Sequence, residues 1–485
     1  MKLTDYQSSE EQWRNGDEQQ TVAQKQARQT NSPARKLIEA TDTVKIARIV
    51  EPLLPPQHKL QPSTTYITRK YALVLIGLLS IIVFQALNSG PSQFAGAQGW
   101  AYVLGGPTGG GDSNLLNGVG KQSTKAGTTG QSTHKLTPTE YVNLVVQKMS
   151  LDQKLGQMMI VQFVGSEYSL ELSTMVKQYN VGSVLIFAAN QNIVSKDQLK
   201  GLIQQMQVDS PIPLAVAIDQ EGGYVDRLAS LDGKRPAESE IGATGDPTVA
   251  QQAGLQDAQD LSYYGINLNL APVVDVTNVY NPQLDHRTYG NTADLVTKMA
   301  GAYLGGLQQS GKVVGTLKHF PGLGDVTVDP HVGVPELARS KSSLEQIDWA
   351  PYRNLIQQGN TVHAIMVTHE IVDALDTTKP SSLSYKVVTG ILRDELGFQG
   401  VIMTDSLTME GIAAYYNEAQ AAALSVEAGS DLLMGASTPQ VLASMIQGIK
   451  QAMNDGQISQ QRIDDSVRRI LLMKYQMGLL TIPTN

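Results

Sequence analysis

The chain has 485 residues, with 45 acidic and 37 basic side chains, a formal charge of −8 and no cysteine. A disulfide scaffold and a thiolate metal site are therefore excluded. The acidic balance argues against a protein held on nucleic acid by phosphate contacts, so no nucleic-acid partner is expected. The length fits either about three average domains or one large α/β barrel with added segments.

The N-terminal part reads as a polar tail followed by an apolar segment. Residues 1–70 carry 11 Lys or Arg and 8 Asp or Glu among many Gln, Ser and Thr, which is typical of a disordered tail. The following run, YALVLIGLLSIIVFQAL, contains no charge and as a helix would extend about 26 Å, near the short limit for a bilayer span. We expect a transmembrane helix at 71–88 rather than a core helix, because the run is apolar on every side. A cleaved signal peptide fits less well, since a long tail precedes the run.

Charge around this segment predicts its orientation. Arg69 and Lys70 flank one end, whereas the next basic residue on the other side is Lys121. Basic residues favour the cytoplasmic side, so the tail should be cytoplasmic and the remainder of the chain extracytoplasmic. Residues 89–135 are rich in Gly, Ser and Thr and predict a flexible linker, after which one folded domain is expected at 136–482.

Eight short aliphatic runs alternate with longer amphipathic stretches in this domain. The runs cover residues 157–163, 181–187, 213–219, 266–275, 313–320, 363–369, 400–406 and 431–435. Continuous apolar strands separated by helix-length segments are typical of a parallel sheet covered by helices. Eight such units predict an α/β fold of the (β/α)8 barrel type, with a doubly wound open sheet as the alternative.

Polar residues gather where these runs end, at the edge where barrel enzymes build their active sites. They are Asp219, Asp275, Lys318, His319, His369 and Asp405. Five of the seven histidines also fall between residues 286 and 369. Zinc is the alternative use of such a cluster, but no HExxH or comparable ligand spacing is present, so neither a metal nor another cofactor is expected.

One stretch, KHFPGLGDVTVDPH at residues 318–331, begins at a strand end and passes through glycines into a loop with an Asp-x-His pair. Residues two apart in extended backbone face the same side, so Asp329 can accept a hydrogen bond from the His331 ring and fix its tautomer. A histidine oriented in this way can act as a general acid and base. An ordinary surface pair is the alternative interpretation.

This stretch resembles the KHFPGHGD…DSH signature of the family 3 glycoside hydrolases, in particular their single-barrel β-N-acetylglucosaminidases (β-N-acetylhexosaminidases). Three further segments agree with the family in order. They are DQEGG at 219–223 followed by Arg227, NLAPVVD at 269–275 followed by Arg287, and TDSLTMEG at 404–411. The resemblance covers essentially residues 137–480 and implies a barrel enzyme that cleaves glycosidic bonds.

The resemblance also implies a role for each matching residue. Asp405 takes the position of the family nucleophile, which attacks the anomeric carbon and forms a covalent glycosyl-enzyme. His331, paired with Asp329, takes the position of the group that protonates the leaving oxygen and then activates water. The positions that hold N-acetylglucosamine are matched by Asp219, Arg227, Arg287, Lys318 and His319.

Three residues depart from the family's pattern. Leu323 stands where the signature has histidine, Tyr224 follows Gly-Gly where arginine is common, and Pro330 replaces serine between the dyad residues. Proline restricts the residue before it, so the dyad loop should be stiffer here. None of the three removes a residue with an implied chemical role.

The chain after the nucleophile position favours the N-acetylglucosaminidase branch. In other branches of the family, the acid/base residue resembles a glutamate supplied by a second domain after the barrel. Here we expect the 80 residues after Asp405 to form only the last strand and the closing helices. We therefore expect a monomeric exo-β-N-acetylhexosaminidase, anchored in the cell membrane by one helix, that acts on peptidoglycan fragments or chitooligosaccharides. The alternatives are a β-N-acetylglucosaminide phosphorylase that uses phosphate as acceptor, and a non-catalytic wall-binding or sensor protein.

Overall fold

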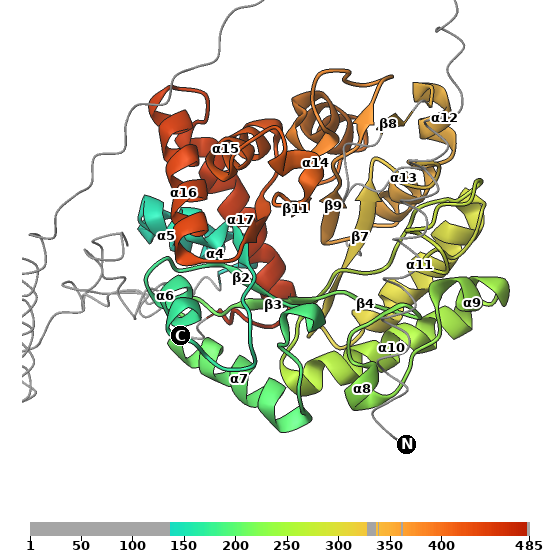
Figure 1. Ribbon diagram of the computed structural model, residues 1–485, viewed down its shortest axis with the longest axis horizontal. Helices are drawn as coiled ribbons and strands as arrows, with labels where there is room; N and C mark the ends of the chain where they lie inside the picture. Colours follow the sequence, from blue (N-terminus) through green and yellow to red (C-terminus); the bar gives the residue numbers. More distant parts are fainter. Residues whose placement is uncertain (1–135, 327–335, 338, 360–361, 483–485) are drawn as a thin grey trace, which may run out of the picture. The chain divides into compact units, whose positions relative to one another are not determined.

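The computed structural model describes residues 136–326, 336–337, 339–359 and 362–482, which form a closed barrel of parallel strands surrounded by helices (Figure 1). The tail, the expected transmembrane segment at 71–88 and the linker lie outside the described residues. Within the described ranges, none of the helices combines the length and the apolar character that a membrane span needs.

Eight strands close the barrel in the order β1-β12-β11-β9-β7-β6-β3-β2, and all eight neighbouring pairs are parallel. The strands are β1 Met159–Val161, β2 Ser183–Ile186, β3 Ala215–Ile218, β6 Leu268–Asn269, β7 Val314–Phe320, β9 Ala364–Val367, β11 Val401–Ser406 and β12 Leu432–Ala436. Each strand overlaps one of the eight aliphatic runs. The predicted (β/α)8 barrel is therefore confirmed, and the alternative prediction of a doubly wound open sheet is wrong. Strand β11 ends in two half-buried residues, Asp405 and Ser406, whereas the other seven strands are buried throughout.

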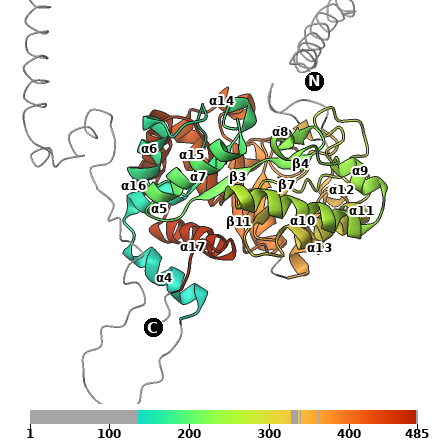
Figure 2. The same ribbon diagram turned by 90° about the horizontal axis from the view of Figure 1, so that it is seen from below.

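Helices return the chain between strands and form the outer layer (Figures 1 and 2). They are α6 Leu170–Lys177, α7 Lys196–Asp209, α10 Pro247–Tyr264, α11 Ala293–Leu307, α13 Ala350–Gln357, the π-helix η3 Lys386–Glu395, α15 Glu418–Ala428 and α16 Pro439–Asn454. Helices α4 Pro138–Lys148 and α5 Leu151–Gln157 precede β1, and the last helix, α17 Gln460–Gln476, packs against both.

Polar residues define where several of these helices begin. Thr137, Ser150 and Asn417 each accept a hydrogen bond from the backbone N–H three residues later. In each case the Glu or Gln side chain at that later position returns a bond to the cap backbone, which completes a capping box.

Short elements fill the loops after the strands, on the side where the site is expected. They are the 3₁₀ turns η1 Ala188–Asn190 and η2 Ser381–Leu383, the helices α8 Ala229–Asp232, α9 Glu238–Ala243, α12 Lys341–Gln346 and α14 Glu410–Ala413, the antiparallel pair β4 Gln220–Gly222 and β5 Val225–Asp226, and the parallel pair β8 Glu336–Leu337 and β10 Ile371–Val372. The loops at this end of the barrel are therefore longer and more structured than a simple strand-to-helix turn.

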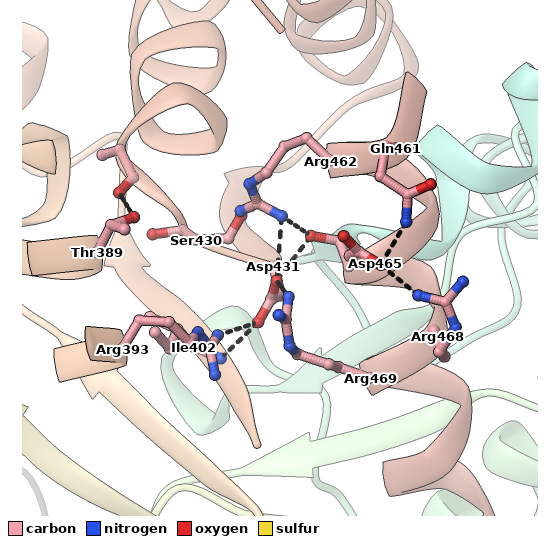
Figure 3. Close-up of polar contacts among 12 residues, drawn as sticks. Thr389, Arg393, Ile402, Ser430, Asp431, Gln461, Arg462, Asp465, Arg468 and Arg469 are labelled. Carbon is pink, nitrogen blue, oxygen red and sulfur yellow. Dashed lines mark hydrogen bonds and ion pairs between the residues drawn. The ribbon is translucent and has the colours of Figure 1, made fainter. Parts of the chain in front are cut away.

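A buried carboxylate joins four elements at the opposite end of the barrel (Figure 3). Asp431, directly before β12, pairs with Arg393 of η3 at 2.8 Å, and with Arg462 and Arg469 of α17 at 3.2 and 3.1 Å. Its oxygens also accept hydrogen bonds from the Ser466 hydroxyl at 2.7 Å and from a backbone N–H of β11 at 3.1 Å. Burial alone would raise the pKa of Asp431, but the three guanidinium groups lower it, so the carboxylate is ionised at neutral pH.

Substitution of this carboxylate should destabilise the fold strongly. Asp431→Asn leaves three arginines without their counter-charge, and we expect a loss of about 3–5 kcal/mol in the free energy of unfolding, measured by urea denaturation. The matched control is Asp465→Asn, which removes a partly exposed pair with Arg468 on α17 and should cost about 1 kcal/mol or less. Equal losses in the two variants would contradict this role for Asp431.

Candidate active site

A cavity of about 350 Å³ opens at the carboxyl ends of the barrel strands. Its lining includes every described residue to which the family resemblance gave a role, namely Asp219, Arg227, Arg287, Lys318, His319 and Asp405. The rest of the wall is largely apolar and includes Leu185, Phe187, Leu270, Met366 and Met434. A cavity with an apolar wall and a few convergent polar groups is typical of a site for a small ligand.

Glu221, which the sequence analysis did not select, holds several of these side chains in place. Its buried carboxylate accepts two hydrogen bonds from Arg287, at 2.7 and 2.8 Å, and pairs with Lys318 at 2.6 Å. Lys318 also pairs with Asp219 at 2.7 Å. Burial alone would raise the pKa of Glu221, but Lys318 and Arg287 hold it well below its usual value, so it is ionised. The sequence did contain an indication of this pairing, because Asp219 and Glu221 are two residues apart and side chains at that spacing in extended backbone face the same side.

The Asp275 side chain fixes the orientation of the His319 ring. The Asp275 carboxylate lies 2.7 Å from Nδ1 of His319 and accepts the backbone N–H of Leu323 at 2.7 Å. Because Nδ1 is engaged, Nε2 of His319 is left for a ligand in the cavity. Gly324, the second glycine of the KHFPGLGD motif, is needed for close packing, because a Cβ at this position would lie 2.0 Å from the carbonyl oxygen of Val276.

Asp405 stands where β11 reaches the cavity. Its Oδ1 accepts the backbone N–H of Ser406 at 2.7 Å. Burial alone would raise the pKa of Asp405, but His369, His319 and the Ser406 N–H lower it. His369 is itself held in place, with Nδ1 2.7 Å from the Ser382 hydroxyl and Nε2 2.9 Å from the carbonyl oxygen of Ser406. The carboxylate is therefore ionised and fixed, as a nucleophile requires.

Arg227 lines the cavity next to an aromatic side chain. Its guanidinium group lies 5.1 Å from the centre of the Phe187 ring. A guanidinium group at the wall of a cavity is a hydrogen-bond donor suited to ligand oxygens.

Asp329 and His331 lie outside the described residues, so the acid/base dyad stays a prediction. Arg339, which follows that segment, forms ion pairs with Asp325, which precedes it, and with Asp348. Across the described ranges, no cluster of three or more His, Cys, Asp or Glu side chains is arranged to hold a metal ion.

A second acidic residue next to the site has its pKa shifted in the opposite direction. Glu370 directly follows His369 and is fully buried. Burial raises the pKa of Glu370 well above its usual value, and the negative charges of Asp275 and Asp405 raise it further, while its own backbone N–H and the Thr368 hydroxyl partly oppose this rise. The surroundings of Glu370 therefore favour its protonated form, and sequence patterns carried no signal for this.

The Glu370 proton makes stability depend on pH. Since the pKa is higher in the folded state than in the unfolded chain, the free energy of unfolding should fall as pH rises above the usual glutamate value of 4.5, by up to about 1.4 kcal/mol per unit, until the folded-state pKa is reached. Glu370→Gln copies the shape of the neutral acid and should remove this dependence, so thermal unfolding should show greater stabilisation at pH 8 than at pH 5.

The control for that measurement is Glu427→Gln, an exposed position on α15. It should change the melting temperature equally at the two pH values. The account of Glu370 would be contradicted if Glu370→Gln lowered stability at pH 8, or if its effect were the same at both pH values.

The fold is a (β/α)8 barrel with a cavity suited to a small ligand, and comparison with known proteins identifies its family. Residues 150–473 match the Glycosyl hydrolase family 3 N terminal domain, and the chain belongs to glycoside hydrolase family 3. The family and the enzyme class predicted from the sequence motifs are confirmed.

The relatives and solved structures that match include hexosaminidases. The chain is 32% identical over 340 residues to beta-hexosaminidase A of Pseudoalteromonas piscicida, a match that spans 63% of this chain and 55% of that protein. It is 36% identical over 271 residues to a beta-hexosaminidase of Neisseria meningitidis serogroup C, spanning 54% and 73% of the two chains. A family 3 beta-N-acetylglucosaminidase from Paenibacillus sp. superposes with a TM-score of 0.64 at 32% identity, over 70% of this chain and 65% of that one.

Proposed function

We propose that the chain is a retaining exo-β-N-acetylhexosaminidase that removes terminal N-acetylglucosamine from peptidoglycan fragments or chitooligosaccharides. The observation that carries the proposal is the ionised Asp405 in a cavity whose other polar groups are suited to a sugar. Carboxylates such as Asp219 accept hydrogen bonds from sugar hydroxyls, while Lys318 and Arg287 donate to sugar oxygens. The similarity to a family 3 beta-N-acetylglucosaminidase at 32% identity supports the choice of sugar.

The proposed reaction has two steps. The Asp405 carboxylate attacks the anomeric carbon while the bond to the leaving oxygen breaks, and His331 gives its proton to that oxygen. Water then attacks the glycosyl-Asp405 ester, His331 takes the proton from the water, and the carboxylate leaves. Two inversions at one carbon give net retention. Asp329 is assigned the role of orienting His331.

Turnover of aryl glycosides tests the proposal against both alternatives. The N-acetylglucosaminide should be cleaved faster than the N-acetylgalactosaminide and the glucoside, and added phosphate should change neither the rate nor the product, free N-acetylglucosamine. Formation of a sugar 1-phosphate would instead identify a phosphorylase. Absence of turnover on every substrate would support the non-catalytic alternative.

A series of N-acetylglucosaminides whose leaving groups differ in acidity tests the dyad. His331→Ala should lose most activity on the substrate with the least acidic leaving group, because proton donation matters least when the leaving group is already acidic. Equal losses on all leaving groups would overturn the role of His331 as the acid.

We further propose that residues 71–88 anchor the enzyme in the cell membrane with the barrel outside. The uncharged apolar run and the flanking Arg69 and Lys70 support this. Protease added to intact cells should release the barrel by cutting in the linker at 89–135. Survival of the full-length chain, with a surface-exposed control protein degraded, would contradict this orientation.

A further inference from the structure

Two exposed tyrosines lie on loops that also line the catalytic cavity. Tyr224, 70% exposed, is in the turn between β4 and β5, and Tyr280, 73% exposed, is in the long loop between β6 and α11. Val225, directly after Tyr224, and Gln283, three residues after Tyr280, line the catalytic cavity. Large exposed aromatic side chains beside a ligand cavity indicate a surface that receives part of the ligand.

The turn that carries Tyr224 is held firmly. Gly222 and Gly223 have φ values of +88° and +58°, in the left-handed region. A Cβ on Gly222 would lie 2.2 Å from the carbonyl oxygen of Pro236, so the turn packs closely on that segment. The same hairpin carries Glu221, which anchors the charged groups of the cavity. Tyr224 is therefore presented from a rigid support, which lowers the entropic cost of using it for binding.

His286 completes an aromatic surface with Tyr224. The two rings meet edge to face, with their centres 5.4 Å apart. Nδ1 of His286 lies 3.3 Å from the Ser239 hydroxyl, which fixes the imidazole. The next residue, Arg287, reaches into the catalytic cavity and binds Glu221, so this loop contributes to the cavity and to the exposed surface at once.

A second hollow of about 430 Å³ adjoins this surface, and Leu284 lines both hollows. Its lining combines aromatic and polar side chains, including Tyr280, Asp285, His286, Thr288, Tyr289 and Asn291. Aromatic and polar side chains lining one hollow fit a ligand that has apolar C–H faces and hydroxyl groups, as a pyranose does.

We propose that Tyr224, Tyr280 and His286, the aromatic platform, bind the second sugar of a β-linked N-acetylglucosamine chain, on the leaving-group side of the scissile bond. This rests on the proposed function, because it assumes that the first sugar occupies the cavity with Asp405. Leu284 lines both hollows, so the second hollow lies beside the cavity that would hold the first sugar. The enzyme is thereby built for oligosaccharides rather than for sugars with small aglycones.

The test compares two substrates that differ in what they place on the platform. Chitotriose reaches it with its second sugar, whereas N-acetyl-β-glucosaminyl fluoride has a leaving group of one atom and does not. Tyr224→Ala and Tyr280→Ala should each lower the ratio of kcat/KM for chitotriose to kcat/KM for the fluoride by roughly 5- to 10-fold, with the change mainly in KM, as expected for the loss of one aromatic contact. Tyr385→Ala, a 60% exposed tyrosine next to η3, is the matched control and should leave the ratio unchanged.

The outcomes separate the platform from the proposed function. If the wild-type enzyme cleaves neither substrate, the proposed function fails. If it cleaves both and the two tyrosine variants leave the ratio at the wild-type value, the platform is overturned while the function stands. A loss confined to a peptide-bearing disaccharide, with chitotriose unaffected, would assign the surface to a peptide and would also overturn the proposal of a second sugar.

Discussion

The buried carboxylate of Glu221 is the contact on which the catalytic cavity depends, because its two oxygens hold Arg287 and Lys318 at hydrogen-bond distance. The three residues come from the hairpin after β3, the loop after β6 and strand β7. With Asp219 on Lys318, the group contains two cations and two carboxylates, so four charges share one site without a net charge. Removal of Glu221 alone would leave two buried cations unpaired, which is far more costly than loss of a surface pair. The positions of Arg287 and Lys318, two of the groups assigned to sugar binding, therefore follow from one carboxylate.

The surroundings shift the pKa values of two acidic residues near the cavity in opposite directions. Asp405 faces histidine rings and a backbone N–H, which lower its pKa despite burial, and it is ionised. Glu370 is fully buried near two other carboxylates, which raises its pKa and favours its protonated form. The environment, rather than the residue type, therefore decides which carboxyl group is available as a nucleophile.

Most of the architecture could be predicted from the sequence, because a parallel barrel buries its strands on both faces and so produces eight continuous aliphatic runs. The described site residues were predictable for a related reason, since polar side chains such as Lys318 and Asp405 interrupt those runs only at their ends. Glu221 was missed although it lies two residues after Asp219. Glu370 was missed because its importance depends on burial by distant segments, which periodicity does not report. The same applies to Asp431, whose partners Arg462 and Arg469 come from a helix some 30 residues later.

The central claim, that the ionised Asp405 is the nucleophile of a retaining glycosidase, is tested most directly by identifying the covalent intermediate. The enzyme would be quenched in acid during turnover of an activated aryl N-acetylglucosaminide, digested, and analysed by mass spectrometry. The account predicts one N-acetylhexosamine attached to the peptide that contains Asp405, and no adduct in Asp405→Asn. An adduct on another carboxylate while Asp405 stays unmodified, or wild-type turnover by Asp405→Asn, would contradict it.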